Sequence, residues 1–308
     1  MKTFIKVTEI WIPGKDRTHL VFGSGLYGPL TDFKTISEHQ RFAYDEGLPG
    51  KAWAARHPIV LTNFEHSYFK RTAAAQKAGL TCGIALPIFS GDFLLSVVVF
   101  LCGDDDNHAG AIEVWCNEVN NGDTLHVMDG YYSSLKDFEA LSKQITLPKN
   151  QGLPGLAWAT GMPVLREDIG TNHEFIRSAY AHQVGITTAL GIPVVNNQEQ
   201  SYVMTFLSAK STPIAKRIQI WIPDKEGKYL ICQQGYSKSS NDLAEIFETL
   251  AVTKGVGALG RVWLTGLPSI TGVTEDANYN TALEHLNSML AIPVIEGGRL
   301  KAIVTFLF

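Results

Sequence analysis

The chain has 308 residues, of which 45% are hydrophobic and 18% charged, and its formal net charge is −4. This apolar content excludes an intrinsically disordered chain, and the lack of any basic run longer than two residues disfavours a nucleic-acid-binding protein. The longest apolar stretch, Val97–Cys102, is far shorter than the roughly 20 residues of a membrane-spanning helix. Because no signal peptide is evident either, we expect a cytoplasmic protein without membrane contact.

The six tryptophans reveal an internal repeat. Trp11, Trp115 and Trp221 recur at intervals of 104 and 106 residues. Each is followed by a glycine-rich turn that ends in a second tryptophan, and later by an aliphatic–proline–aliphatic tripeptide: Gly47–Trp53 and Leu86–Ile88, Gly152–Trp158 and Ile192–Val194, Gly257–Trp263 and Ile292–Val294. The same landmarks occur in the same order three times. We therefore predict three domains, at residues 1–106, 107–211 and 212–308.

Within the first copy, the pattern predicts a hairpin, two short helices separated by a strand, and a closing hairpin. In chain order these elements are Glu9–Ile12, Thr18–Phe22, Lys51–Arg56, Ile59–Leu61, Ser67–Ala78, Cys82–Ile88 and Leu94–Leu101. Proline just inside a helix start supports the first helix, and Gly79 is a C-cap signal that ends the second. Each copy is therefore predicted to be an α+β domain, an antiparallel sheet with short helices on one face.

The closing strand of each copy is apolar on both faces. These segments are Ser96–Leu101, Tyr202–Leu207 and Ala302–Phe308. A strand of this kind is usually central and covered on both sides, yet the linkers Gly103–Gly110 and Ala209–Lys216 are too short to supply a long covering helix. We expect the copies to bury this sheet face against each other or against another chain.

The combined motif order resembles the GAF domain. The resemblance rests on the aliphatic–Trp pair, the Gly-Leu-Pro-Gly turn, the Phe-x-Arg sequence before an Ala-rich helix, and the aliphatic–Pro–aliphatic tripeptide. It implies a five- or six-stranded antiparallel sheet with a small-molecule pocket between the sheet and its helices. Such domains sense ligands or mediate dimerisation, and most are not enzymes. The cyclic-nucleotide motif and the bilin-anchoring Cys–His pair of that family are missing here.

The third copy departs from the other two. From its second tryptophan to the proline of the tripeptide it has 30 residues, against 34 in the first copy. About one helical turn is lost, and the arginine of the Phe-x-Arg sequence is lost with it. We expect pocket-forming features only in the first two copies.

Two aligned arginines are the first candidate ligand-binding residues. Arg71 and Arg177 each follow an aromatic residue two positions earlier, Phe69 and Phe175. In a pocket such an arginine could hold an anion through two parallel hydrogen bonds. The alternative interpretation is a solvated or ion-paired surface arginine.

Four further residues complete the candidate site. Trp53 and Trp158 either line the pocket or anchor the core through their large apolar area. Cys82 and Thr188 occupy one aligned position of the candidate ligand site, where Cys82 is either a reactive or redox-active thiol or, as we favour, a buried inert thiol.

No catalytic or metal-binding constellation emerges, because the histidines and the four cysteines lack recurring or metal-ligand spacing. No cofactor or ligand can be named from the sequence. We predict a non-enzymatic small-molecule sensor that acts through packing between its copies, or through a separate protein partner or a second copy of itself. The alternative is a protein-interaction or oligomerisation module with no small-molecule ligand.

Overall fold

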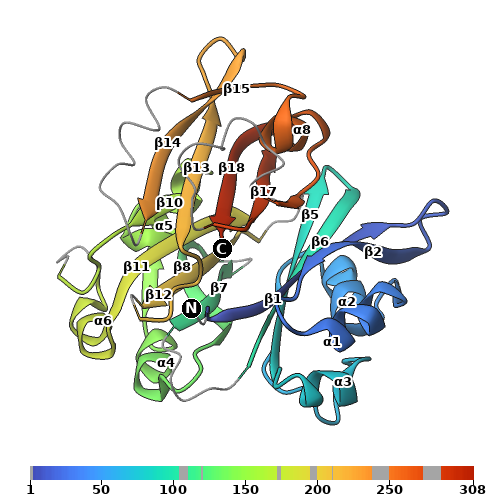
Figure 1. Cartoon of the computed structure of the whole chain (residues 1–308). Coiled ribbons are helices and arrows are strands. Elements are labelled where there is room, and N and C mark those ends of the chain that lie inside the picture. Colours follow the sequence, from blue (N-terminus) through green and yellow to red (C-terminus); the bar gives the residue numbers. More distant parts are fainter. Residues whose placement is uncertain are drawn as a thin grey trace.

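A computed structural model of the chain describes residues 3–103, 110–118, 121–171, 175–194, 200–209, 211–237, 250–272 and 286–308. It contains three six-stranded antiparallel sheets, each formed by one of the predicted copies (Figure 1). The prediction of three tandem α+β repeats is confirmed. The first predicted domain boundary, between residues 106 and 107, lies outside the described residues.

The first two repeats have the same order of elements, and the described part of the third repeat follows it. The first contains β1 (Ile5–Pro13), β2 (His19–Leu26), α1 (Thr31–Glu38), β3 (Arg41–Ala43), α2 (Gly47–Ala55), β4 (Ile59–Leu61), α3 (Thr72–Lys77), β5 (Cys82–Ser90) and β6 (Phe93–Cys102). The second contains β7 (Gly110–Glu118), β8 (Asn121–Tyr131), α4 (Lys136–Ser142), β9 (Thr146–Pro148), α5 (Gly152–Thr160), β10 (Val164–Arg166), α6 (Ser178–Val184), β11 (Ile186–Val194) and β12 (Tyr202–Ala209). The third contains β13 (Arg217–Pro223), β14 (Tyr229–Ser237), β15 (Ala251–Thr253), α8 (Gly257–Thr265), β16 (Ser269–Gly272), β17 (Ser288–Glu296) and β18 (Arg299–Leu307).

The strand order of the first sheet is β3-β2-β1-β6-β5-β4, and the other two sheets repeat it. The first and last strands of each repeat therefore pair at the centre of the sheet, which explains the two-sided apolar pattern of the closing strands. The helix that starts at the glycine turn is placed correctly, although it already begins at Gly47. Gly50 must be a glycine because a Cβ atom there would lie 2.2 Å from the carbonyl oxygen of Ala43.

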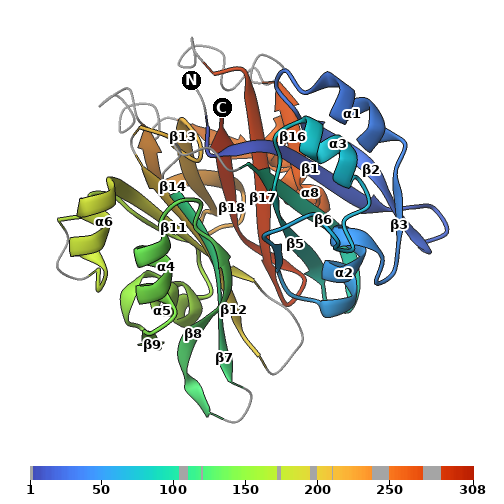
Figure 2. The ribbon, with the colours of Figure 1, turned by 90° about the horizontal axis from the view of Figure 1, so that it is seen from below.

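The helices of each repeat cover the outer face of its sheet. In Figure 2, α1–α3 lie outside the first sheet and α4–α6 outside the second. The first tryptophan of each repeat lies fully buried on this outer, helix-covered side: Trp11, Trp115 and Trp221. No helix in the described part of the chain is long and apolar enough to cross a bilayer.

The inner faces of the three sheets pack against one another in a shared core. The rings of Phe100, Phe206 and Phe306, one from each closing strand, form a triangle with centroid distances of 5.3–6.4 Å. The three aliphatic–proline–aliphatic tripeptides converge around a void of about 20 Å³, which is room for a single water molecule. The expectation that the copies bury their uncovered sheet faces against each other is confirmed.

The repeats contact one another cyclically. Strand β4 of the first repeat lies against β8 of the second, β10 against β14 of the third, and β16 against β2 of the first. The same pair of elements thus meets at every junction, so the three head-to-tail contacts close a ring with approximate threefold symmetry. At the junction of the second and third repeats, Gln234 Nε2 donates a hydrogen bond to the Leu165 carbonyl oxygen at 2.9 Å.

Candidate functional site

A buried ion pair lies between the sheet and the helices of the first repeat. Arg71, at the start of α3, reaches Glu9 on β1 with two hydrogen bonds, Nη2 to Oε2 at 2.8 Å and Nη1 to Oε1 at 2.5 Å. The exposed fractions of the two side chains are 1% and 0%. The guanidinium also lies 4.8 Å from the ring centroid of Phe33, so it is enclosed by aromatic side chains.

Further hydrogen bonds complete this centre. Glu9 accepts from Trp11 Nε1 at 3.0 Å and from the Tyr27 hydroxyl at 2.9 Å. Burial raises the pKa of the Glu9 carboxyl, but the Arg71 charge and these donors outweigh it, so the pKa lies below its usual value. The carboxylate is therefore ionised at neutral pH, and it accepts hydrogen bonds from Arg71, Trp11 and Tyr27.

The second repeat carries the same centre, and the third carries a neutral version. Arg177 pairs with Glu113, and both are buried. In the third repeat the glutamate position holds Gln219, whose Oε1 accepts from Trp221 Nε1 and from Thr305 Oγ1, both at 3.2 Å. Where the arginine is missing, the carboxylate is thus missing too.

The structure places both predicted arginines in the core, and neither lines either of the two grooves described below for the first two repeats. Glu9 and Glu113 already pair with the guanidinium groups of these arginines, so an anionic ligand would have to displace a carboxylate of the chain itself. Ligand binding by the two arginines stays a prediction. The two glutamates were missed in the sequence. The available signal was that each stands two residues before the first tryptophan of its repeat and becomes Gln219 in the copy that lacks the arginine.

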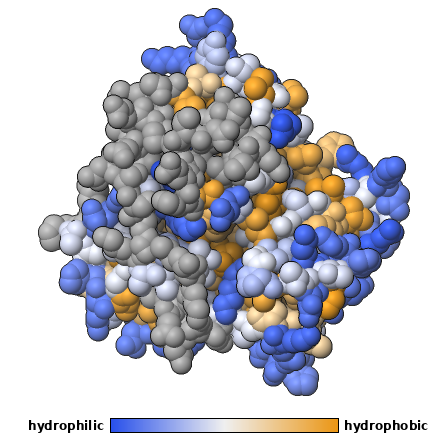
Figure 3. All heavy atoms as spheres, viewed as in Figure 1, coloured by the Kyte–Doolittle hydropathy of each residue, from blue (hydrophilic) through white to orange (hydrophobic). Residues whose placement is uncertain are grey.

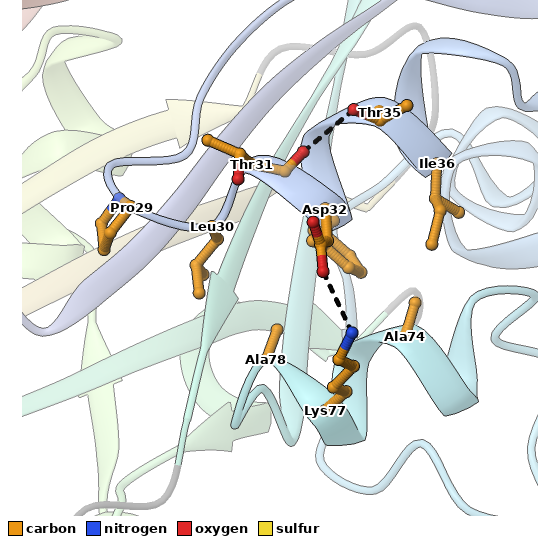
Figure 4. Close-up of a pocket in the computed structure, with 10 residues that line it drawn as sticks. Pro29, Leu30, Thr31, Asp32, Thr35, Ile36, Ala74, Lys77 and Ala78 are labelled. Carbon is orange, nitrogen blue, oxygen red and sulfur yellow. Dashed lines mark hydrogen bonds and ion pairs between the residues drawn. The ribbon is translucent and has the colours of Figure 1, made fainter.

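The first repeat has an open groove of about 500 Å³ between α1 and α3. Its wall includes Leu30 and the small residues Ala74 and Ala78, and the ion pair between Asp32 and Lys77, at 3.0 Å, crosses it (Figure 4). In the second repeat the positions of the two alanines hold Tyr180 and Val184. The groove in the first repeat therefore depends on two small side chains.

The second repeat has a different groove, of about 470 Å³, at the start of α5. We call it the repeat-two groove; its lining residues are Asn150, Gln151, Gly152, Leu153, Leu156, Arg166, Ile169, Phe175 and Ile176. Leu153, Ile169 and Phe175 are buried and belong to one apolar cluster, whereas Ile176 is 56% exposed. Among the described residues of the lining, Arg166 is the one that carries a charge.

Two ion pairs occupy the corresponding place in the first repeat. Lys70 contacts Glu46, and Lys51 contacts Asp45 at 2.9 Å. In the second repeat all four positions are neutral, namely Ile176, Gln151, Leu156 and Asn150. The second repeat thus has neither ion pair, and it has two apolar side chains, Ile176 and Leu156, where its groove is open.

The other predicted residues lie elsewhere. Trp53 on α2 and Trp158 on α5 are half-buried. The ring centroid of Trp53 lies 5.3 Å from that of Tyr44 in an edge-to-face arrangement. The ammonium of Lys149 lies over the ring of Trp158, 5.0 Å from its centroid. Cys82 lies in the inner core shared by the repeats. Two further predicted residues are buried: Phe69, stacked on Phe64, and Thr188 on β11. Of the eight predicted residues, Phe175 alone lines either groove.

No group of three or more histidine, cysteine, aspartate or glutamate side chains suited to a metal ion occurs among the described residues. Arg166 was missed in the sequence because the candidate residues were found as side chains that recur at aligned positions. The residue that corresponds to Arg166 in the first repeat is Leu61.

No protein-family model and no curated protein matches the chain. Among solved structures it is similar to the GAF domain of A. Aeolicus nlh2, with 23% identity and a TM-score of 0.27, and to a GAF domain/HD domain protein from Geobacter sulfurreducens, with 15% and 0.28. It is also similar to the free methionine-R-sulfoxide reductase from Neisseria meningitidis, with 15% and 0.26. These matches cover 32–33% of this chain, about the length of one repeat, and 52–63% of the other chains.

Proposed function

We propose that these three tandem GAF-like repeats form a cytoplasmic, non-enzymatic sensor that binds a small molecule in the repeat-two groove. One observation carries the proposal: the second repeat has neutral, partly apolar side chains at the four positions where two ion pairs lie in the first repeat. The resulting volume of about 470 Å³ falls in the range of small-molecule sites. The mostly apolar lining with a few polar groups at the rim is also typical of such sites.

Two contacts connect the repeat-two groove to the third repeat. The start of α5 lines the groove, and Gly161 at the end of α5 lies beside the carboxylate of Glu296 in the third repeat. The Leu165 carbonyl accepts from Arg166 in the groove and from Gln234 across the junction. A ligand that moves α5 or Arg166 would therefore alter the packing between the second and third repeats. A separate protein partner could recognise this change in packing.

A graft from the first repeat tests this proposal. The double variant Gln151→Glu/Ile176→Lys places the Glu46–Lys70 pair across the repeat-two groove without removing any core residue. We expect compounds from a metabolite library that raise the melting temperature of the wild type to lose that effect in the graft. The matched control is Glu46→Lys/Lys70→Glu, which keeps an ion pair in the first repeat and leaves the repeat-two groove unchanged. Equal binding by wild type and graft would contradict the proposal.

The alternative, an interaction module without a small-molecule ligand, is favoured by a different observation. The space between sheet and helices, where the family resemblance implies a pocket, is filled by buried arginine–glutamate pairs in the first two repeats. Hydrophobic atoms also reach the surface in several places on the face seen in Figure 3, and Leu264 of α8 is 61% exposed. Native mass spectrometry of freshly purified protein separates the two functions, because it reports a bound small molecule or a bound protein directly.

A further inference from the structure

We infer that the ligand of the repeat-two groove is a small amphipathic carboxylate, whose apolar body lies on the groove floor and whose charge is held by Arg166. This inference rests on the proposed function of the same groove and adds the chemical class of the ligand.

Arg166 is available to an anion. It is half-buried at the end of the edge strand β10, and among the described residues its side chain makes one hydrogen bond, a long one from Nη1 to the Leu165 carbonyl oxygen at 3.3 Å. No carboxylate of the described residues lies within ion-pair distance of it. This distinguishes Arg166 from Arg177, whose donors are taken by Glu113. A guanidinium with unused donors matches the two oxygens of a carboxylate.

The acidic residues that follow Arg166 in the chain do not neutralise it. Glu167 and Asp168 are exposed, and neither lines the groove. Desolvation and then the charge of Asp168 raise the pKa of Glu167, whereas a nearby arginine would lower it. Neither carboxylate forms an ion pair with Arg166 in the described part of the chain.

The rest of the lining selects the remainder of the ligand. Leu153, Ile169 and Phe175 offer an apolar floor, and the amides of Asn150 and Gln151 are the other polar side chains. Because the described residues of the lining include one cation and no carboxylate, the groove matches a single negative charge, whereas an ammonium group would face the guanidinium without a carboxylate to pair with. A dianionic phosphate ester would find one cation for two charges.

Three probes of nearly equal shape test the charge requirement: 4-phenylbutanoate, 4-phenylbutanamide and 4-phenylbutylammonium. Binding to the full chain is measured by calorimetry and ligand-observed NMR. We expect the carboxylate to bind about 10- to 100-fold more tightly than the amide, as for one charge-assisted contact, and the ammonium not to bind. In Arg166→Gln the preference for the carboxylate should disappear. Arg261→Gln, an exposed substitution on α8, is the matched control and should retain it.

Equal affinity for carboxylate and amide, or a preference that survives Arg166→Gln, would overturn the inference while leaving small-molecule binding intact. Failure of all three probes to bind at millimolar concentration would also overturn it. The proposed function is tested separately. It fails when no library compound raises the melting temperature of the wild type more than that of the grafted variant Gln151→Glu/Ile176→Lys.

Discussion

Arg177→Met provides a direct test of the buried ion-pair centre. The substitution removes the charge but keeps an unbranched side chain, so the change in volume is modest. Glu113 would remain fully buried, with hydrogen bonds from Trp115 Nε1 and Thr205 Oγ1 at 2.9 Å but no counter-charge. Breaking a buried pair by removing one partner costs about 3–5 kcal/mol, and we expect a loss of that size in the free energy of unfolding at pH 7.

The third repeat shows how this loss can be offset. There the glutamine at position 219 is satisfied by a tryptophan and a threonine without any arginine. The double variant Glu113→Gln/Arg177→Met reproduces that arrangement, since the corresponding partners Trp115 and Thr205 are already in place. We expect the double variant to be more stable than Arg177→Met by about 2 kcal/mol, a coupling in the range for residues in direct contact.

Urea unfolding followed by far-ultraviolet circular dichroism measures these differences, and pH provides a second readout. In the wild type the pKa of Glu113 lies below its usual 4.5, because burial, which raises it, is outweighed by Arg177 and the hydrogen bonds. Its contribution to stability is therefore present above pH 4.5 and is lost as the pH falls below it. Without Arg177, burial dominates and the pKa rises above 4.5, so the deficit of the variant should shrink between pH 7 and pH 5. A deficit below about 1 kcal/mol, or one independent of pH, would refute the reasoning.

Two further substitutions test the packing on either face of the sheets. Gly25→Ala would place its Cβ 2.5 Å from the Tyr27 ring and 3.1 Å from the Thr8 carbonyl oxygen; we expect a loss of about 1–3 kcal/mol in urea unfolding, and a smaller loss in a Tyr27→Ala background. Phe206→Ala removes one ring of the central triangle and should cost about 3–5 kcal/mol, lowering the calorimetric unfolding temperature of all three repeats together. The control is Phe93→Ala, at a ring that is 65% exposed, which should change stability by less than about 0.5 kcal/mol. Equal losses of stability in Phe206→Ala and Phe93→Ala would contradict the shared core.

The fold was predictable because its signals are local and occur three times. The spacing of the tryptophans and proline tripeptides defined the repeats, and the two-sided apolar closing strands indicated central strands. The predicted helix Ser67–Ala78 was wrong in its first turn, because α3 begins only at Thr72. Ser67 Oγ accepts from the Phe69 N–H and donates to the Phe64 carbonyl, so a side-chain–backbone turn replaces the helical hydrogen bonds there.

The candidate site was less predictable because its partners are distant in sequence. Arg71 and Glu9 are 62 residues apart, and no local sequence pattern indicates that the carboxylate of Glu9 pairs with the guanidinium of Arg71. The repeat-two groove lies where the first repeat has two ion pairs, and which charges pair there is known only from the structure. Arg166 has no counterpart that would draw attention to it in the aligned copies.

The closed ring also changes how a single substitution acts. In a ring of three identical chains, every mutation would appear at all three equivalent positions, and a change that opens one groove would open three. Here the three positions are encoded separately on one chain. The first repeat can keep a groove that depends on Ala74 and Ala78, the second can open another beside Arg166, and the third can become neutral at Gln219. Covalent linkage thus permits three specialised units within one symmetric scaffold.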